Sequence, residues 1–213
     1  MTENKIYRAA DNSFFYNYKL YLPEGYCKDK AYPILFFLHG AGERGNNHEL
    51  LAVHGPFKKI ARGEAFDCIC VAPQCPSESF WITETQTLKI FMDAICAEYN
   101  ADPTRVYITG ISMGGFGTWT MAIRYPEMFA AAVPICGGGM PWAAYALTKM
   151  PIWAFHGDAD DAVEPKYSVD MVNAINARGG SAKLTMYPGY GHDCWTDTYD
   201  NPAFWQWLFE QKK

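Results

Sequence analysis

Residues 105–117 constrain the fold of this 213-residue chain more than any other stretch. The segment begins as a short apolar strand, reaches a Gly-Ile-Ser-Met-Gly turn at residues 110–114, and continues at once with a helical pattern. A Gly-x-Ser-x-Gly turn between a strand and a helix lifts the serine hydroxyl above a sheet. Gly110 and Gly114 suit such a turn because a side chain at either position would crowd it. The sequence therefore predicts a sharp corner with Ser112 at its apex.

Strand-like and helix-like segments alternate along the rest of the chain. Short apolar runs occur at residues 15–22, 34–38, 68–72, 106–109, 131–136, 152–155 and 183–187. Helical periodicity is found at residues 83–99, 113–125, 166–178 and 202–211. Strands that alternate with helices form βαβ units, so we predict the α/β class, with a mostly parallel central sheet covered by helices on both faces. No repeat or linker interrupts the pattern, and residues 1–213 are expected to form a single domain.

Composition and charge narrow the classes of partner. The net charge is −5, and no block of like charges is present. These features argue against nucleic acid and against an anionic membrane surface, which leaves a small molecule as the expected partner. The first residues contain no apolar run that could serve as a signal peptide or membrane span, so a complete chain of this kind is expected to be cytoplasmic.

The seven cysteines favour free thiols over a disulfide framework, because their number is odd and no leader is evident. Cys68, Cys70 and Cys75 have a C-x-C-x₄-C spacing that differs from the paired spacing of zinc ligands. Cys68 and Cys70 also lie in an apolar run. We therefore expect these thiols to pack in the core, and we expect no metal site.

Polar residues follow several of the predicted strands. In an open α/β sheet, ligands bind at the carboxyl ends of the strands. The His-Gly-Ala-Gly-Glu-Arg-Gly stretch at residues 39–45 follows one strand, and Ser112 follows another. Two later strands are followed by residues 156–160, with two aspartates, and by residues 189–192, which end in His192. A serine, a carboxylate and a histidine thus follow three of the predicted strands, in that order along the chain, and they are the groups that nucleophilic catalysis requires.

These motifs together resemble a known family. Gly-Ile-Ser-Met-Gly-Gly-Phe-Gly, Leu-His-Gly-Ala-Gly-Glu-Arg-Gly, His-Gly-Asp-Ala-Asp-Asp-Ala-Val and Gly-Tyr-Gly-His are similar to the phospholipase/carboxylesterase and dienelactone-hydrolase-like branch of the α/β-hydrolases. The Gly-Glu-Arg-Gly loop, and Pro-Gln-Cys-Pro with a following tryptophan, resemble a group of predicted peptidases related to feruloyl and acetyl-xylan esterases. The resemblance covers residues 20–207. It implies the α/β-hydrolase fold and a serine carboxylesterase that needs no cofactor.

The resemblance also implies a catalytic role for particular residues. Ser112 is the nucleophile, and His192 takes its proton and returns it to the leaving group. The family pattern His-Gly-x-x-Asp-x-x-Val places the acid that orients His192 at Asp160. Asp158 is expected to turn its own loop through hydrogen bonds to the backbone, and Asp161 is expected to point to solvent.

Backbone amides are expected to form the oxyanion hole. One is Met113, directly after the nucleophile, and by resemblance the second is Ala41. His39 is then expected to brace this loop rather than act as a second base. Glu43 and Arg44 either pair to brace the loop or touch substrate. The glycine-rich loop lacks the ending of a P-loop and the spacing of a dinucleotide fingerprint, so nucleotide binding is not expected.

Aromatic residues give a weaker signal about the substrate. Trp81, Trp142 and Trp195 fall on loops near the expected catalytic end. We take Trp81 and Trp195 as candidate substrate-binding residues, with ordinary packing as the alternative.

The segment at residues 137–150 is too short for the large cap of lid-bearing lipases. An open site without a large cap favours small to medium acyl or aryl esters as the small-molecule substrate. The alternatives are a serine peptidase or amidase of the same fold, and a hydrolase-fold protein that binds a ligand without catalysis.

Overall fold

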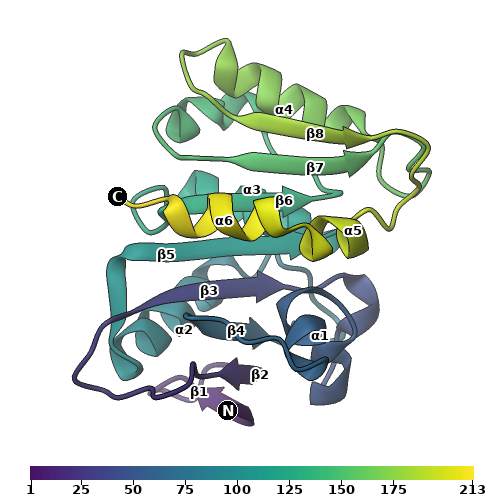
Figure 1. Ribbon diagram of the computed structural model, residues 1–213. Coiled ribbons are helices and arrows are strands. Elements are labelled where there is room, and N and C mark those ends of the chain that lie inside the picture. The colour runs from purple at the N-terminus through teal and green to yellow at the C-terminus, as the bar shows by residue number, and fades with distance from the viewer.

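Eight strands form one mixed sheet in the computed structural model, which describes residues 1–213 (Figure 1). The spatial order is β1-β2-β4-β3-β5-β6-β7-β8. The antiparallel side consists of β1 (Thr2–Arg8) and β2 (Phe15–Tyr21), and β2 pairs with β4 (Ile69–Pro73). The remaining pairings are parallel and involve β3 (Tyr32–Leu38), β5 (Ala101–Ile111), β6 (Ala131–Ile135), β7 (Trp153–Gly157) and β8 (Lys183–Tyr187). The predicted α/β class with a mostly parallel sheet is confirmed.

Helices cover both faces of the sheet. One face carries α2 (Thr85–Glu98), α3 (Met113–Arg124) and α4 (Lys166–Asn176), and the other carries α1 (Gly55–Ala61), α5 (Trp195–Asp200) and α6 (Pro202–Glu210). Figure 1 shows α6 crossing in front of the sheet while α2 and α3 lie behind it. Three 3₁₀ helices, η1 (Ala41–Glu43), η2 (His48–Ala52) and η3 (Pro141–Leu147), lie in the connections.

The run of apolar residues in β3 is continuous because both faces of this strand are buried. Ile34, Phe36 and Leu38 pack into the hydrophobic cluster on one face of the sheet, while Leu35 and Phe37 pack into the cluster on the other. All five are at most 1% exposed. Burying each such side chain contributes about 1.5–3 kcal/mol, so this central strand anchors both layers. The sheet position of Ser112 is consequently fixed, because β3 pairs directly with β5.

Three elements were absent from the sequence prediction. The edge strand β1 alternates exposed and half-buried residues, so it has little apolar signal and is held by backbone pairing with β2. The helices α1 and α5 have only 7 and 6 residues, too short for a clear helical period. The predicted helices otherwise end within a few residues of the observed ones.

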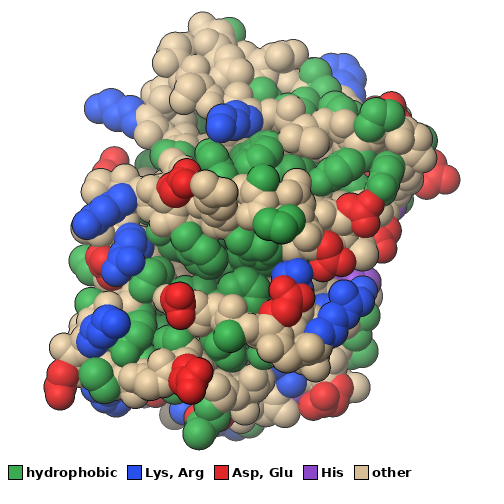
Figure 2. Space-filling view, viewed as in Figure 1, with side chains coloured by type: hydrophobic (Ala, Val, Ile, Leu, Met, Phe, Trp, Pro, Cys, Tyr) green, Lys and Arg blue, Asp and Glu red, His purple; other side chains and the backbone are tan.

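The connection between β6 and β7 holds η3 and no large inserted helix bundle, in agreement with the short segment expected there. None of the helices is both long enough and apolar enough to span a membrane. Acidic and basic side chains are interspersed on the face shown in Figure 2.

The turn at Ser112 has the geometry that its glycines predict. Ser112 adopts φ 53° and ψ −117°, a conformation that a non-glycine residue rarely takes. A Cβ built on Gly114 would lie 1.9 Å from the carbonyl oxygen of Leu38, and one on Gly110 would lie 2.4 Å from that of Gly114. The turn therefore closes against β3 only because both positions lack a side chain.

We expect Gly114→Ala to destabilise the fold by about 3 kcal/mol, because its Cβ would meet rigid backbone rather than a flexible side chain. Urea denaturation monitored by circular dichroism measures the change. Gly42→Ala is the matched control, since a Cβ at Gly42 meets nothing within 4 Å. Equal stability of the two variants would contradict the close approach of the turn to β3.

Candidate active site

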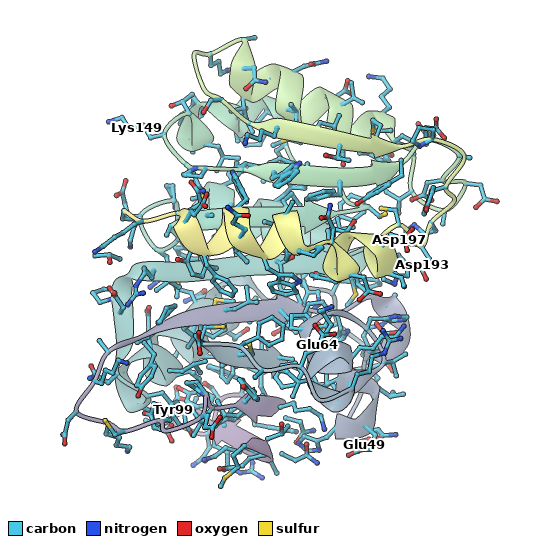
Figure 3. All side chains as sticks on the ribbon, in the orientation of Figure 1. Glu49, Glu64, Tyr99, Lys149, Asp193 and Asp197 are labelled. Carbon is cyan, nitrogen blue, oxygen red and sulfur yellow. The ribbon has the colours of Figure 1, made fainter.

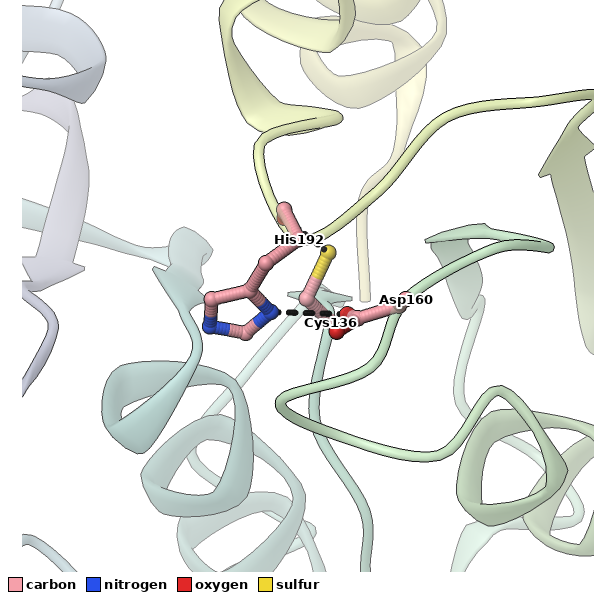
Figure 4. Close-up of side chains that lie close together, drawn as sticks. All are labelled: Cys136, Asp160 and His192. Carbon is pink, nitrogen blue, oxygen red and sulfur yellow. Dashed lines mark hydrogen bonds and ion pairs between the residues drawn. The ribbon is translucent and has the colours of Figure 1, made fainter.

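Three loops at the carboxyl edge of the sheet bring Ser112, His192 and Asp160 together. Ser112 lies between β5 and α3, Asp160 follows β7, and His192 lies between β8 and α5. His192 Nε2 is 2.9 Å from Ser112 Oγ, and His192 Nδ1 is 2.7 Å from Asp160 Oδ2 (Figure 4 shows the second contact). An ionised carboxylate only accepts hydrogen bonds, so Nδ1 carries the proton. In the neutral ring, Nε2 is then free to accept the hydroxyl hydrogen of Ser112.

The Asp160 carboxylate is buried and fully hydrogen-bonded. Its Oδ1 accepts from the amides of Ala162 and Val163, each at 2.9 Å. Burial by itself raises the pKa of Asp160, but the hydrogen bonds from His192 and from the two amides outweigh burial and hold the pKa below its ordinary value. Asp160 therefore carries a negative charge beside His192 at neutral pH.

The two neighbouring aspartates make different contacts. Asp158 Oδ1 accepts a hydrogen bond from the amide of Gly189 at 2.7 Å, which joins its loop to the loop that leads to His192. Asp161 is exposed. Of the three aspartates that the sequence offered, Asp160 is the one that contacts the histidine.

His156 contacts the same Asp160 carboxylate oxygen as His192 does and helps to hold it in place, a role that sequence reasoning missed. The imidazole is fully buried, and its Nε2 lies 2.9 Å from Val163 O and 3.2 Å from Asp160 Oδ2. Its Nδ1 is 2.8 Å from the hydroxyl of Ser168. The signal was available in the motif, because His156 precedes Asp160 by four residues.

Two groups raise the proton affinity of His192. The adjacent Cys136 sulfur and the Asp160 carboxylate raise the pKa of His192 to about 9, against the opposite effect of partial burial. Potential metal-ligand atoms of Cys136, Asp160 and His192 all lie within 4.8 Å of one another. A metal ion there would have to break the hydrogen bond between His192 and Asp160, so these residues are better suited to proton transfer.

Two backbone amides border the space beside Ser112. A Cβ at Gly40 would lie 3.8 Å from Ser112 Cβ, so the loop after β3 passes directly over the turn. Ala41 is the next residue, and Met113 is the first residue of α3. Amides in the first turn of a helix have no acceptor within that helix. Ala41, Ser112 and Met113 line the same cleft.

His39 braces this loop, in agreement with the sequence analysis. His39 is buried, and its Nε2 accepts a hydrogen bond from the amide of Cys75 at 3.0 Å. Nδ1 then carries the proton and donates to Gly40 O at 2.6 Å. Burial lowers the pKa of His39 to about 4, so the ring stays neutral at neutral pH. The loop is thereby joined to the segment after β4.

Glu43 and Arg44, which the sequence suggested as a bracing pair, have separate partners. Arg44 Nε donates to Ala41 O at 3.0 Å, and its guanidinium lies 4.8 Å from the centre of the Phe80 ring. The nearest basic group to Glu43 Oε1 is His54 Nε2, at 3.9 Å. Arg44 therefore braces the loop without help from Glu43.

An apolar cleft of about 340 Å³ adjoins Ser112. Its other walls are Phe80, Ile82 and Phe116, together with Ala41 and Met113. Sequence reasoning missed the three larger side chains. Phe116 follows Ser112 by four residues and hence shares its side of α3, which is the signal that could have identified it.

The two candidate substrate-binding tryptophans differ in position. Trp81 is fully buried, and its Nε1 donates to His39 O at 3.0 Å. The expectation that Trp81 contacts substrate is therefore wrong, because Trp81 packs beneath the loop while its half-exposed neighbours Phe80 and Ile82 face the cleft. Trp195 does border the site, with its ring centre 5.1 Å from that of His192.

The rim near Trp195 carries charges of both signs. Lys58 on α1 and Arg62, directly after that helix, border a small hollow together with Trp195. Asp193 and Asp197 lie around the start of α5 (Figure 3). A rim of mixed charge gives no single-sign field that would favour a charged ligand.

Comparisons with known proteins identify the family and the fold of the chain. The model of the dienelactone hydrolase family matches residues 72–202. A solved thermostable esterase has a TM-score of 0.88 and 32% identity, covering 100% of this chain and 63% of that one. The feruloyl esterase module from Clostridium thermocellum has a TM-score of 0.77 and 18% identity, covering 99% of this chain and 88% of that one. The second likeness shows the fold alone.

Among curated proteins, the bifunctional acetylxylan esterase/xylanase XynS20E from Neocallimastix patriciarum is 31% identical over 136 residues. The matched region is 62% of this chain and 20% of that protein, so the chain spans a small part of this relative's length. The family match, in contrast, extends from the end of β4 to the start of α6 and includes the segments that carry Ser112, Asp160 and His192. The chain belongs to the dienelactone hydrolase family.

Proposed function

We propose that this chain is a serine carboxylesterase that hydrolyses small to medium acyl or aryl esters. The observation that carries the proposal is the hydrogen-bonded series from Asp160 through His192 to Ser112, which ends beside an apolar cleft. A serine hydroxyl is a weak nucleophile by itself and requires an oriented base within hydrogen-bond reach. His192 meets this requirement, and Asp160 holds its ring.

In the first half of the reaction, Ser112 Oγ attacks the ester carbonyl as His192 Nε2 takes the hydroxyl proton. The amides of Met113 and Ala41 donate hydrogen bonds to the oxygen that becomes negatively charged. His192 then gives the proton to the leaving alcohol, and an acyl-enzyme on Ser112 remains. The negative charge of Asp160 stabilises the imidazolium that exists between these two proton transfers.

In the second half, water replaces the alcohol. His192 Nε2 takes a proton from this water as the water oxygen attacks the acyl-enzyme carbonyl. The same two amides stabilise the second tetrahedral intermediate, and Ser112 leaves with the proton that His192 returns. Both halves of the proposed reaction use the side chains and backbone amides of the chain together with the ester and one water molecule.

The cleft supports an uncharged acyl or aryl group. Phe80, Ile82 and Phe116 offer apolar surface, and no ionisable side chain lines the cleft beside Ser112. His192, which would protonate the leaving alcohol, lies toward Trp195 and the mixed-charge rim. The cleft is therefore suited to the acyl group and the rim to a polar alcohol. The names of the relatives, acetylxylan esterase and feruloyl esterase, describe esters of this type.

We expect Ser112→Ala to reduce kcat for ester hydrolysis by about 10⁴-fold or more, because the nucleophile is lost. Initial rates should be measured on short-chain, long-chain, feruloyl and acetyl-sugar esters and on aminoacyl amides. Ser77→Ala is the matched control, since Ser77 is exposed and lies outside the cleft. Retained ester turnover in Ser112→Ala would exclude Ser112 as the nucleophile, and preference for amides would favour the peptidase alternative.

Asp160→Asn should lower kcat by about 10⁴-fold with little change in KM, because an amide leaves His192 without a charged partner and favours the wrong tautomer. Steady-state kinetics on one good ester measures the effect. Asp161→Asn makes the same chemical change at an exposed position and should stay within twofold of the unchanged protein. Similar losses in both variants would mean that Asp160 has no special role.

The pH dependence of kcat/KM reports the state of His192. The base must be neutral to accept a proton, and its pKa is raised to about 9. Activity on a neutral ester should therefore rise with pH, with a midpoint above the ordinary histidine value of about 6.5. Cys136→Ala removes one of the groups that raise this pKa and should move the midpoint to lower pH. A midpoint at or below the ordinary value in the unchanged protein would contradict the raised pKa.

A further inference from the structure

We infer that Cys136 and Cys194 are a disulfide-forming pair that links the loop carrying His192 to the end of β6 under oxidising conditions. Their sulfur atoms are 3.1 Å apart, and both side chains are fully buried. A disulfide requires sulfur atoms about 2.05 Å apart, so the two need to approach by only about 1 Å. The formation of this bond is independent of the proposed esterase function, whereas its effect on catalysis rests on that function.

The two cysteines join a fixed part of the sheet to the catalytic loop. Cys136 directly follows β6, and its amide donates to Phe155 O on β7 at 2.9 Å. Cys194 comes two residues after His192 and directly precedes α5. A bond between the two sulfur atoms would therefore tie the loop of His192 to the centre of the sheet.

Cys136 and Cys194 both form hydrogen bonds with the backbone of His192. His192 O accepts a hydrogen bond from the amide of Cys194 at 3.0 Å and from Cys136 Sγ at 3.1 Å. Figure 4 shows Cys136 beside His192, whose ring is turned toward Asp160. The ring nitrogens are bonded to Ser112 and Asp160, and neither bond involves a sulfur atom. Disulfide formation consumes only thiol hydrogens, so the catalytic hydrogen bonds can persist.

The other close thiol contact in the chain has an unsuitable geometry. Cys68 and Cys70 have sulfur atoms 3.6 Å apart, farther than those of Cys136 and Cys194, and only one residue lies between them. The short connection between them limits how closely their β-carbons can approach, whereas a disulfide requires a β-carbon separation of about 3.5–4.5 Å. Cys136 and Cys194 belong to separate segments, so no such constraint keeps them apart.

The surroundings prepare Cys136 to react first. A hydrogen bond from the Cys194 thiol stabilises the Cys136 thiolate, which lowers the pKa of Cys136 and raises that of Cys194. The thiolate is the form of cysteine that attacks an oxidant. One thiol in the pair is thus set as the attacking group and the other as the resolving group.

Hydrogen peroxide supplies the oxidant for a balanced reaction. The Cys136 thiolate attacks one peroxide oxygen, the O–O bond breaks, and hydroxide leaves while a sulfenic acid forms. The Cys194 sulfur then attacks the sulfenic sulfur, the S–O bond breaks, and the S–S bond forms. The departing hydroxyl takes the Cys194 proton and leaves as water. The hydroxide from the first step takes up the proton that Cys136 released on ionising, so in total two thiols and one peroxide give one disulfide and two waters.

The test uses the full chain carrying Cys27→Ser, which removes the exposed thiol. The folded protein is treated with hydrogen peroxide, and intact mass, peptide mapping and thermal unfolding are measured before and after. We expect the loss of two hydrogens, a Cys136–Cys194 cross-linked peptide and a rise in Tm of about 5–10 °C, because a disulfide restricts the unfolded chain. Dithiothreitol should reverse all three changes.

Control variants separate this pair from the other thiols. In the same background, Cys136→Ala and Cys194→Ala should each abolish the cross-link and the rise in Tm, while Cys68→Ala should retain both. No cross-link in the folded protein, or one at another pair, would overturn the inference even if the variants fold poorly, because the measurement on the Cys27→Ser protein stands by itself.

Ester hydrolysis is measured on the same samples. We expect the oxidised protein to keep its activity and to retain it at temperatures at which the reduced protein is inactive. A cross-link with raised Tm but no ester hydrolysis in either state would leave the disulfide standing and overturn the proposed function. Ester hydrolysis without a cross-link would overturn the disulfide and leave the proposed function standing.

Discussion

The close approach of α3 to the carboxyl end of β3 is the contact on which the rest of the site depends. Gly114 lies so near the Leu38 carbonyl that a Cβ would be 1.9 Å from its oxygen. This approach forces Ser112 to φ 53°, a strain of about 1–3 kcal/mol that the paired strands around it must offset. In return, Ser112 lies directly beneath Gly40 and Ala41. The positions of the proposed nucleophile and of the proposed oxyanion amides are therefore set by one packing contact rather than by flexible side chains.

Two histidines at the same edge of the sheet have pKa values shifted in opposite directions, by burial in one and by neighbouring groups in the other. Burial lowers the pKa of His39 to about 4, and the Glu43 carboxylate, 3.9 Å from its Nδ1, makes no hydrogen bond with it. The adjacent Cys136 sulfur and the bonded, buried Asp160 carboxylate raise the pKa of His192 to about 9. The first ring stays neutral and serves as a fixed bridge between loops. The second is able to hold a proton between two transfer steps, which is the property that a general base requires.

Sequence reasoning anticipated the structure where the geometry depends on short local patterns, and it failed where the geometry depends on long-range packing. The turn at Ser112 follows from glycines two residues away on either side, and Asp160 was assigned through the resemblance of residues 156–163 to a family pattern. Trp81 was misjudged because three neighbouring large side chains on a loop have no sequence signal that tells which one turns inward. The contact between Cys136 and Cys194 was invisible for a related reason, since it joins segments that only the folded sheet brings together.

The end of β6 connects the two halves of the proposed catalytic machinery. The amide of Ser112 donates to Ile135 O at 2.9 Å, and the next residue, Cys136, contacts His192 O through its sulfur. Residues 135 and 136 therefore hold both Ser112 and His192, and this short segment of backbone helps to set the distance between them. A loop that carries a catalytic base is usually among the less stable parts of a fold. A covalent link at Cys136 would restrain that loop at the point from which the serine is also positioned, so it would stabilise the loop without drawing His192 away from Ser112.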